Sequence, residues 1–215
     1  MRVLKVPETG AKRKLLDAAE ALVAKKGFDG VSVRDVTGAI KANVAAVNYH
    51  FGSREGLMDL VMMKSLGPLC KERAKTLDGL GKTASVEALV SAYVRAVLTT
   101  AGTLEMEPEF FLCLVGRVQV IEDGNLPELL SLERKNVSHR YLKSLARALP
   151  EMDPAELAMR WDFFESGLGQ ALLSVKSKDN APDLLECWSR FGVLGLSGDH
   201  SVDSMEGGQG MLFEL

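Results

Sequence analysis

The chain has 215 residues, of which 47% are hydrophobic, and a formal net charge of −3. A chain of this length and apolar content can bury a substantial core, which excludes disorder over most of it. No apolar run approaches the roughly 20 residues needed to span a bilayer, and the N-terminal segment lacks the apolar core of a signal peptide. We therefore expect a cytoplasmic protein with no membrane partner.

The charge is divided unevenly along the chain. Residues 1–54 hold 10 Lys and Arg against 5 Asp and Glu, a net of +5, whereas the remaining 161 residues hold 16 against 24, a net of −8. A basic end on an acidic body is typical of a protein that presents that end to nucleic acid. Solvated helix faces give similar basic runs, and the two explanations are compatible.

Two short helical patterns follow a longer one near the N-terminus. The longer pattern, residues 11–26, repeats apolar residues at steps of three and four and ends at Gly27, a residue suited to the position after a helix. Ser32 and Asp35 then have capping-box spacing, which predicts the start of a short amphipathic helix. Asn43 can cap a second short helix about four residues after the first. Such a pair predicts a helix-turn-helix.

The second short helix is expected to have an inner and an outer face. Val44, Val47 and Phe51 share the inner face, which leaves Ala45, Ala46, Asn48, Tyr49 and His50 outside. The outer residues are small or hydrogen-bonding and none is acidic, which suits an approach to the major groove and its phosphates. An ordinary surface helix is the alternative explanation of this pattern taken alone.

Beyond residue 52 the sequence predicts a larger helical body and no strand. Apolar periodicity and helix-end residues predict helices over residues 53–80, 86–102, 108–118, 127–149, 153–175 and 182–194. Gly67-Pro68 lies inside the first of these, and proline favours a break or a kink there because it removes a helical hydrogen bond. The predicted fold class is all-α.

Four segments within residues 12–57 carry a family resemblance. They are Leu16-Asp17-Ala18-Ala19, Gly27-Phe28, Val31 to Val36, and Asn48 to Ser53. On these segments the chain resembles the DNA-binding domain of TetR-family transcriptional regulators, over about a quarter of its length. The turn departs from the family pattern, because Lys41 and Ala42 stand where such proteins often have Gly and a large aliphatic residue. A positive φ at Lys41 would cost roughly 1 kcal/mol.

The resemblance implies a division of the chain into three parts. These are a helix-turn-helix DNA-binding domain over residues 1–52, a helical ligand-binding and dimerisation domain over residues 53–198, and a flexible tail over residues 199–215. The helix that starts after residue 53 would connect the first two parts and shift when ligand binds. That shift would change the separation of the two DNA-reading heads of a dimer.

Nine residues are candidate DNA contacts, and the resemblance supports all of their positions. Hydroxyl and imidazole groups suit phosphates, and amide and methyl groups suit base edges. A guanidinium group suits either, depending on where its arginine lies. The phosphate candidates are Ser32, Tyr49, His50 and Arg54, and the base-edge candidates are Arg34, Asn43, Ala45, Ala46 and Asn48.

The central helices hold a surplus of large apolar residues that are candidates for an effector pocket. Met and Phe side chains together form an adaptable apolar surface, which suits a hydrophobic effector rather than a sugar or a phosphate. The candidates are Met62, Met63, Leu66, Tyr93, Val97, Phe110, Phe111, Leu114, Arg117, Met159 and Phe163. Most of these side chains can equally be core residues. Arg117 needs a carboxylate partner, a route to solvent or an acidic ligand.

A narrower resemblance bears on the effector. Residues 45–51, Leu66-Gly67-Pro68 and residues 148–151 resemble a TetR branch that includes fatty-acid-responsive repressors. This resemblance implies a fatty acyl effector.

The last two predicted helices have regular apolar stripes with small residues between them, as in half of an intersubunit four-helix bundle. Burial within one subunit is the alternative. TetR-family proteins dimerise through their final two long helices, and the resemblance therefore implies a homodimer. The interface candidates are Leu157, Trp161, Phe164, Leu168, Leu172, Leu184, Trp188 and Phe191.

Residues with catalytic or metal-binding chemistry are sparse. His50, His139 and His200 are far apart in the sequence, and no metal-ligand, nucleophile, P-loop or dinucleotide motif is present. The three cysteines lie widely spaced within apolar patterns, which predicts buried reduced thiols. We expect no catalytic residue, no metal site and no cofactor.

The sequence therefore predicts a TetR-like homodimer that binds a double-stranded DNA operator, represses transcription and leaves the operator when a hydrophobic small molecule binds. The alternative is a helical ligand-binding or scaffold protein that has lost specific DNA recognition through its unusual turn.

Overall fold

The computed structural model describes residues 10–28, 30–104, 106–119, 126–175 and 178–198. Within these ranges every regular element is a helix and no strand occurs, which confirms the predicted all-α class. No helix in them is long and apolar enough to cross a membrane. Residues 1–9 and 120–125, His200 and the tail predicted from residue 199 lie outside the described residues.

Sequence signals placed most helix boundaries correctly. The helices are α1 (Gly10–Lys26), α2 (Val33–Ala39), α3 (Ala45–Phe51), α4 (Arg54–Gly79), α5 (Val86–Ala101), α6 (Pro108–Gln119), α7 (Glu128–Ala148), α8 (Pro154–Leu173) and α9 (Ala181–Ser197), with a 3₁₀ turn at Lys178–Asn180 before α9. Side chains of Ser32, Ser53, Ser85 and Asp153 accept hydrogen bonds from the first turns of α2, α4, α5 and α8. These caps satisfy backbone donors that have no partner within the helix.

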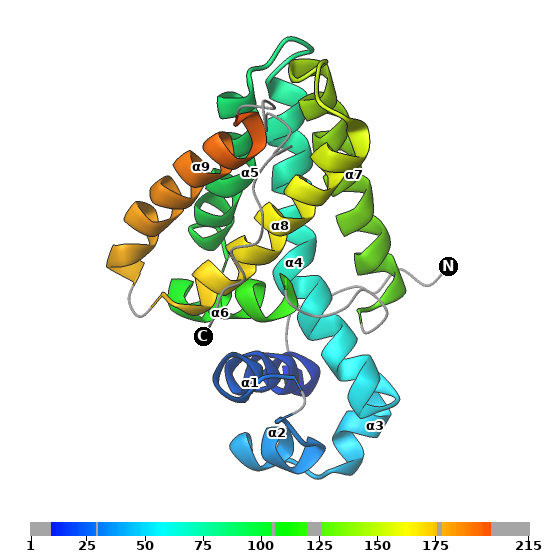
Figure 1. The fold of residues 1–215 in the computed structure, drawn as a ribbon. Helices are drawn as coiled ribbons and strands as arrows, with labels where there is room; N and C mark the ends of the chain where they lie inside the picture. Colours follow the sequence, from blue (N-terminus) through cyan, green and yellow to red (C-terminus); the bar gives the residue numbers. More distant parts are fainter. Residues whose placement is uncertain (1–9, 29, 105, 120–125, 176–177, 199–215) are drawn as a thin grey trace, which may run out of the picture.

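Helices α1, α2 and α3 form one end of the molecule, and α4 runs from this end into the body (Figure 1). Helix α4 contacts α1 and α3 at its start and α5, α6 and α7 farther along. It passes through Pro68 without interruption, so the break considered at Gly67-Pro68 does not occur. Helix α6 packs against both α1 and α8, which gives α1 a second connection to the body.

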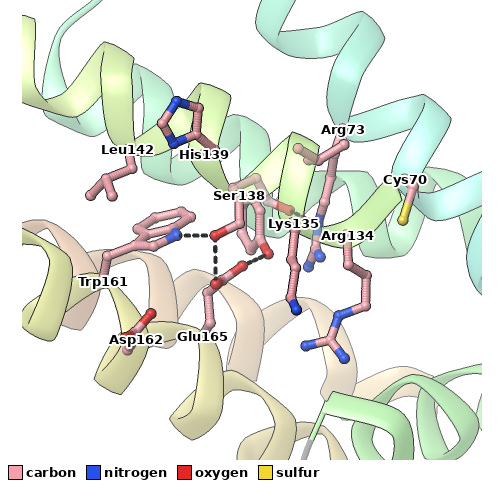
Figure 2. Close-up of a pocket in the computed structure, with 12 residues that line it drawn as sticks. Cys70, Arg73, Arg134, Lys135, Ser138, His139, Leu142, Trp161, Asp162 and Glu165 are labelled. Carbon is pink, nitrogen blue, oxygen red and sulfur yellow. Dashed lines mark hydrogen bonds between the residues drawn. The ribbon is translucent and has the colours of Figure 1, made fainter. Parts of the chain in front are cut away.

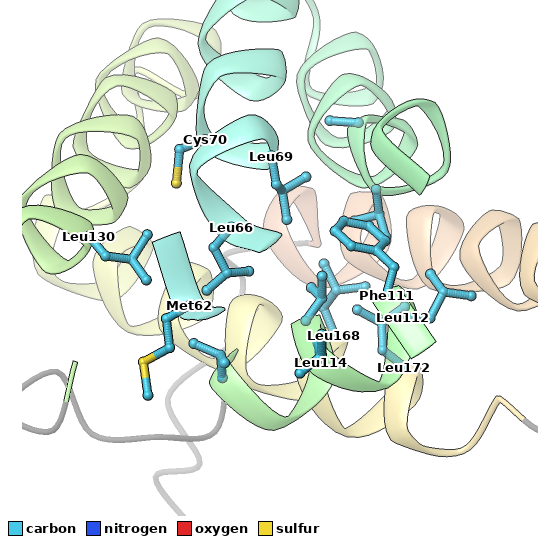
Figure 3. Packing of buried hydrophobic residues seen from close by; sticks show 14 of the residues in the cluster. Met62, Leu66, Leu69, Cys70, Phe111, Leu112, Leu114, Leu130, Leu168 and Leu172 are labelled. Carbon is cyan, nitrogen blue, oxygen red and sulfur yellow. The ribbon is translucent and has the colours of Figure 1, made fainter. Parts of the chain in front are cut away.

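The core of the body consists of tightly buried aliphatic and aromatic side chains, chiefly from α4, α5, α6, α7 and α8. Figure 3 shows part of this core, with side chains of α4, α6, α7 and α8. Cys70 belongs to this core with 6% of its surface exposed. Cys113 is half-buried and Cys187 is exposed on α9, so the prediction of three buried thiols is wrong for Cys187. All three are free thiols. A helical stripe with polar neighbours cannot show from sequence alone which of its edges faces solvent.

The turn between α2 and α3 is closed by backbone hydrogen bonds despite its atypical sequence. The Lys41 N–H donates to the Gly38 carbonyl at 3.2 Å, and the Ala42 N–H donates to the Thr37 carbonyl at 2.9 Å. This is the Schellman arrangement, in which the residue after the helix is left-handed and most often glycine. Lys41 occupies that position with a φ of 54°. The positive φ considered for Lys41 is therefore present.

Replacing Lys41 by Gly is expected to stabilise the fold by about 0.5–1 kcal/mol, because glycine adopts a positive φ without steric cost. Equilibrium chemical denaturation of the full chain measures the change. The matched control is Ala39→Gly, which places glycine inside α2 and is expected to destabilise by about 1 kcal/mol. A Lys41→Gly variant that is less stable than the parent would show that the turn is not strained.

Candidate DNA-binding surface and interior cavity

Helix α3 carries an exposed polar face at the end of the molecule remote from the body (Figure 1). Val47 is fully buried and fixes the helix, whereas Tyr49 is 85% exposed and Asn48 is exposed beside it. The Tyr49 ring contacts His50 edge-on, with 4.9 Å between ring centroids. No acidic residue occurs in α3. The arrangement offers an amide, a phenol and an imidazole on one short helix.

The remaining predicted contacts on this helix differ in exposure. Asn43 and Ala45 are exposed, and the Asn43 Oδ1 accepts a hydrogen bond from the Ala45 N–H at 2.9 Å. Ala46 is half-buried against the core, and so is His50, although both were expected on the outer face. Val44 was expected on the inner face but is 44% exposed, because α3 begins only at Ala45 and Val44 precedes its first turn.

Two of the predicted phosphate contacts, Ser32 and Arg54, form hydrogen bonds within the protein. The Ser32 hydroxyl accepts from the Asp35 N–H at 3.1 Å, and the Ser32 backbone N–H donates to the Asp35 carboxylate at 2.9 Å, which completes the predicted capping box; the hydroxyl also donates to that carboxylate at 2.6 Å. Hydrogen bonds from the Ser32 hydroxyl and backbone N–H lower the pKa of Asp35 to about 2. Arg54 donates from Nε to the Val31 carbonyl at 2.8 Å and also to the Phe28 carbonyl. Arg54 therefore fastens the start of α4 to the segment between α1 and α2.

A cavity of about 260 Å³ lies in the body between α4, α5, α7 and α8. Most of its lining residues are charged, polar or aromatic, and two are aliphatic: Cys70, Arg73, Tyr93, Arg134, Lys135, Val137, Ser138, His139, Leu142, Trp161, Asp162 and Glu165. Figure 2 shows Arg73, Arg134 and Lys135 extending toward the space beside Ser138 and Glu165. Burial raises the pKa of the Cys70 thiol to about 11, so this thiol stays neutral.

A hydrogen-bonded chain of side chains organises one wall of the cavity. The Trp161 indole N–H donates to the Ser138 hydroxyl at 2.7 Å, and that hydroxyl donates to Glu165 Oε2 at 2.8 Å. The Tyr93 hydroxyl donates to Glu165 Oε1. Trp161 also lies parallel to Tyr141, with 6.1 Å between ring centroids. The chain joins α5, α7 and α8 and fixes the Glu165 carboxylate.

Known protein families match both ends of this architecture. Residues 15–61 match the family model described as "Bacterial regulatory proteins, tetR family", and residues 91–182 match the one described as "Tetracyclin repressor-like, C-terminal domain". The chain belongs to the TetR family of transcriptional regulators. Its family and structural neighbours are regulators rather than enzymes.

Individual TetR-family relatives cover the chain to different extents. The HTH-type transcriptional repressor KstR2 of Rhodococcus jostii (strain RHA1) is 32% identical over 91 residues, which is 42% of this chain and 45% of that protein. The chain thus spans less than half the length of the curated relatives that it matches. The structure of the ketosteroid transcriptional regulator KstR2 of Mycobacterium tuberculosis has a TM-score of 0.63 at 15% identity, covering 89% of this chain and 98% of that one.

A second TetR-family structure contains DNA. A cysteine mutant of the regulator CifR, complexed with 26-bp double-strand operator DNA, has a TM-score of 0.59 at 21% identity. The likeness covers 86% of this chain and 98% of that one. At these identities the structural likeness establishes the TetR fold of this chain.

The predicted apolar effector pocket of this TetR-family chain is not where the cavity lies. Tyr93 alone among the eleven predicted pocket residues lines the cavity. Met62, Leu66, Val97, Phe111 and Leu114 are closed core residues, as the alternative allowed, and Met63 and Phe110 are half-buried against that core. Met159 and Phe163 lie on the outer face of α8, 51% and 69% exposed, so their assignment to the pocket is wrong.

Sequence reasoning missed the polar residues of the cavity. Arg73, Ser138 and Glu165 each lie next to apolar residues on the inward side of a helix. This position within an apolar stripe was the sequence signal that could have identified them as site residues. A buried polar residue needs a partner, so polar residues inside an apolar stripe mark an interior site.

Arg117 lies at the contact between α1 and α6, outside the cavity lining. A Cβ atom at Gly27 would come within 3.1 Å of its Nη1, which places the guanidinium at the end of α1. Cations are favourable near helix C-termini, where carbonyl groups lack partners. Nearby, the Cys113 thiol donates to the Ala24 carbonyl at 3.1 Å. Both contacts connect α6 of the body to the end of α1.

Helices α8 and α9 expose a set of large apolar side chains in this TetR fold. Met159 and Phe163 on α8 and Phe191 and Leu194 on α9 are 51%, 69%, 58% and 72% exposed. The predicted interface residues Leu157, Trp161, Phe164, Leu168 and Leu172 are instead buried within the subunit, which corrects their assignment, and Leu184 and Trp188 are half-buried. Of the eight predicted, Phe191 is the one that the structure places with the exposed set.

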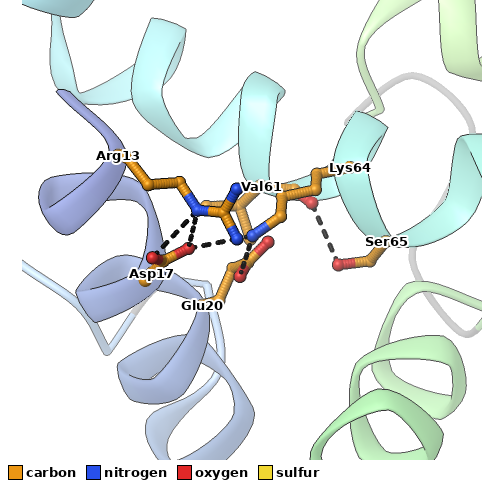
Figure 4. A network of polar contacts seen from close by, with 6 residues as sticks. All are labelled: Arg13, Asp17, Glu20, Val61, Lys64 and Ser65. Carbon is orange, nitrogen blue, oxygen red and sulfur yellow. Dashed lines mark hydrogen bonds and ion pairs between the residues drawn. The ribbon is translucent and has the colours of Figure 1, made fainter. Parts of the chain in front are cut away.

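A polar network joins α1 to α4 (Figure 4). Lys64 donates from Nζ to Glu20 Oε2 at 2.8 Å and to Asp17 Oδ1 at 2.9 Å, and Arg13 pairs with Asp17 at 2.8 Å. Glu20 is 5% exposed, and desolvation raises its pKa although the hydrogen bond and charge of Lys64 act in the opposite direction. The network lies where the DNA-side helices meet the body.

Proposed function

We propose that this chain is a homodimeric repressor that binds an operator of two-fold symmetry and releases it when a small molecule occupies the interior cavity. The observation that carries the proposal is the outer face of α3, where Asn48 and Tyr49 stand exposed on a helix without acidic residues. A short helix of this kind fits the major groove and brings hydrogen-bonding groups to bases and phosphates. The Rhodococcus relative is named a transcriptional repressor, which supports repression rather than activation as the role of this chain.

The division into domains follows the same proposal. Residues 1–52 would form the DNA-binding domain and residues 53–198 the effector-binding and dimerisation domain, with the protein acting in the cytoplasm, where it reaches chromosomal DNA. The exposed apolar residues of α8 and α9 support the dimer, because large exposed apolar patches mark interaction surfaces and two-fold dimers are the commonest oligomers.

Effector binding in the cavity can reach the DNA side by two routes. Helix α4 lines the cavity through Cys70 and Arg73 and contacts α1 and α3 at its start. Helix α6 packs on α8, which also lines the cavity, and touches the end of α1. A small displacement of either helix would change the separation of the two reading heads, and that separation must match the spacing of the half-sites.

The effector class follows from the cavity rather than from the apolar core. The cavity is small and lined by charges, which supports a compact polar or anionic effector over a long fatty acyl chain. The alternative function, a ligand-binding protein without specific DNA recognition, rested on the atypical turn. The turn keeps two backbone hydrogen bonds across Lys41, which supports an intact helix-turn-helix.

Asn48→Ala and Tyr49→Ala are expected to impair DNA binding in different ways. Loss of the Asn48 amide should reduce discrimination of the operator from unrelated DNA about 5- to 150-fold, the range for one base contact of about 1–3 kcal/mol. Loss of Tyr49 should weaken binding to all sequences alike, because phosphate contacts carry no sequence information. Gel shifts on the DNA flanking the gene, at several salt concentrations, measure both effects.

The matched control for these variants is Asn136→Ala, which removes an exposed amide on α7 of the body. It should bind the operator like the parent. Unchanged operator binding by both α3 variants, with the dimer intact, would contradict the DNA-binding surface proposed.

A further inference from the structure

Arg73 is a buried cation without a carboxylate partner in the part of the chain that the structure describes. It is 4% exposed, and its guanidinium carbon lies 3.6 Å from the centroid of the Tyr93 ring. Its Nε donates to the Tyr93 carbonyl at 3.3 Å, and its Nη2 is buried with no hydrogen-bond partner. An arginine stays charged at any physiological pH, so an unused buried donor on it is costly.

Glu165 is a carboxylate that lines the same cavity as Arg73, but both of its oxygens already accept hydrogen bonds from other residues. Its Oε1 accepts from the Tyr93 hydroxyl, and its Oε2 accepts from Ser138 at 2.8 Å. Burial raises the pKa of Tyr93 well above its ordinary value, so the phenol keeps its proton and remains a donor. Two hydroxyl groups therefore hold Glu165, and Arg73 keeps donor capacity at the cavity that both residues line.

The charge of the buried guanidinium favours a monoanion. Arg73 brings one positive charge to the cavity, and Glu165, which also lines the cavity, is already held by two hydroxyl groups. One carboxylate would balance this charge, whereas a phosphate monoester, with nearly two negative charges, would exceed it. A planar carboxylate also matches the fork of a guanidinium in two parallel hydrogen bonds.

We propose that the cavity between α4, α5, α7 and α8 binds a small organic carboxylate, with the carboxylate on Arg73 and a compact body against Trp161 and Leu142. The inference rests on the proposed effector function of the same cavity and names its ligand class. The cavity volume of about 260 Å³ lies just below the roughly 300–1,000 Å³ of typical ligand pockets, which selects a compact acid.

Three matched pairs of acid and amide test the inference by calorimetry on the full-length protein without DNA: acetate and acetamide, benzoate and benzamide, octanoate and octanamide. In at least one pair, and best in benzoate, the acid should bind about 10- to 100-fold more tightly than its uncharged amide, as expected for hydrogen bonds to a charged group. Arg73→Gln should abolish this preference, and Arg73→Lys should keep part of it because the charge remains without the fork.

Asp162→Asn is the second variant, chosen because Asp162 is exposed and its loss should not disturb folding. Removing this negative charge should raise acid affinity about two- to fivefold, and less at high salt. The inference is overturned if no acid is preferred over its amide, if the preference survives in Arg73→Gln, or if Asp162→Asn leaves acid affinity unchanged. The Asp162→Asn result decides the matter if Arg73→Gln fails to fold.

The acid-binding test can fail or succeed independently of the operator-binding test of the proposed function. Operator binding with no acid preference would overturn the ligand class and leave the DNA-binding function standing. An Arg73-dependent acid preference with no effect of the acid on the operator complex would support the ligand class and overturn the proposed release mechanism.

Discussion

Phe163→Glu is expected to convert the protein to a monomer and to weaken operator binding by about a hundredfold or more. Phe163 is 69% exposed on α8, one helical turn from Met159, and Phe191 and Leu194 extend the apolar surface onto α9. In a two-fold interface each substitution occurs twice, and a charge at the centre of an apolar contact costs about 2 kcal/mol or more. A monomer offers one reading head, so it loses the second half-site.

Light scattering across a range of protein concentrations measures the dimer dissociation constant, and gel shifts measure operator affinity. The matched control is Leu132→Glu, because Leu132 is also a large apolar residue and is 58% exposed, but lies on α7. That variant should remain dimeric. A Phe163→Glu protein that stays dimeric at low micromolar concentration would place the interface elsewhere on the molecule.

The helices of this protein were predictable because their ends are encoded locally. The Ser32 and Asp35 capping box and the Asp153 cap before Pro154 occur in the structure as the sequence indicated. Such signals depend on residues within one turn of each other, so they need no knowledge of tertiary structure. The positive φ at Lys41 was considered because TetR-like proteins often have glycine at this position, and the structure shows it.

The facing of α8 could not be decided in the same way, because this helix is apolar on two sides. Trp161 and Phe164 point into the subunit, whereas Met159 and Phe163 point out of it. Periodicity identifies stripes but does not say which stripe meets the chain's own core and which is left for another surface. For this reason Met159 and Phe163 were expected in the pocket but are exposed, and Trp161 and Phe164 were expected at the interface but are buried.

The cavity was beyond prediction because it depends on residues far apart in the sequence. Arg73, Ser138 and Glu165 come from three helices, and their proximity follows from how α4, α7 and α8 pack. The apolar surplus was visible in the sequence, but aliphatic residues that pack closely leave no room for a ligand. Unpartnered polar groups within apolar stripes were the better guide to the site.

Lys64→Met is expected to destabilise the protein by roughly 2–3 kcal/mol at pH 7, and by much less near pH 5. Lys64 compensates the carboxylate of Glu20, which is 5% exposed, through a 2.8 Å contact between Nζ and Oε2. Removing one partner of a fully buried pair typically costs about 3–5 kcal/mol. We expect a smaller cost here because the Lys64 side chain is still 16% exposed.

The pH dependence follows from the pKa of Glu20, which burial raises above its ordinary value even with Lys64 present. A carboxyl group with a raised pKa in the folded state binds its proton more tightly there than in the unfolded chain. The stability that it contributes is fully present below the unfolded pKa and is lost as pH rises through the folded pKa. Lys64→Met removes a hydrogen bond and a charge that lower this pKa, so the loss at pH 7 grows.

Chemical denaturation at pH 5 and pH 7, at one protein concentration because the protein is expected to dimerise, measures the effect. The double variant Glu20→Gln with Lys64→Met should lose the part of the pH dependence that comes from Glu20, since the titrating carboxyl group at this position is gone. Asp17→Asn should cost less than about 1 kcal/mol, because Asp17 is exposed and its pairs are solvated. An equal cost of Lys64→Met at both pH values would mean that Glu20 is not the group that Lys64 compensates.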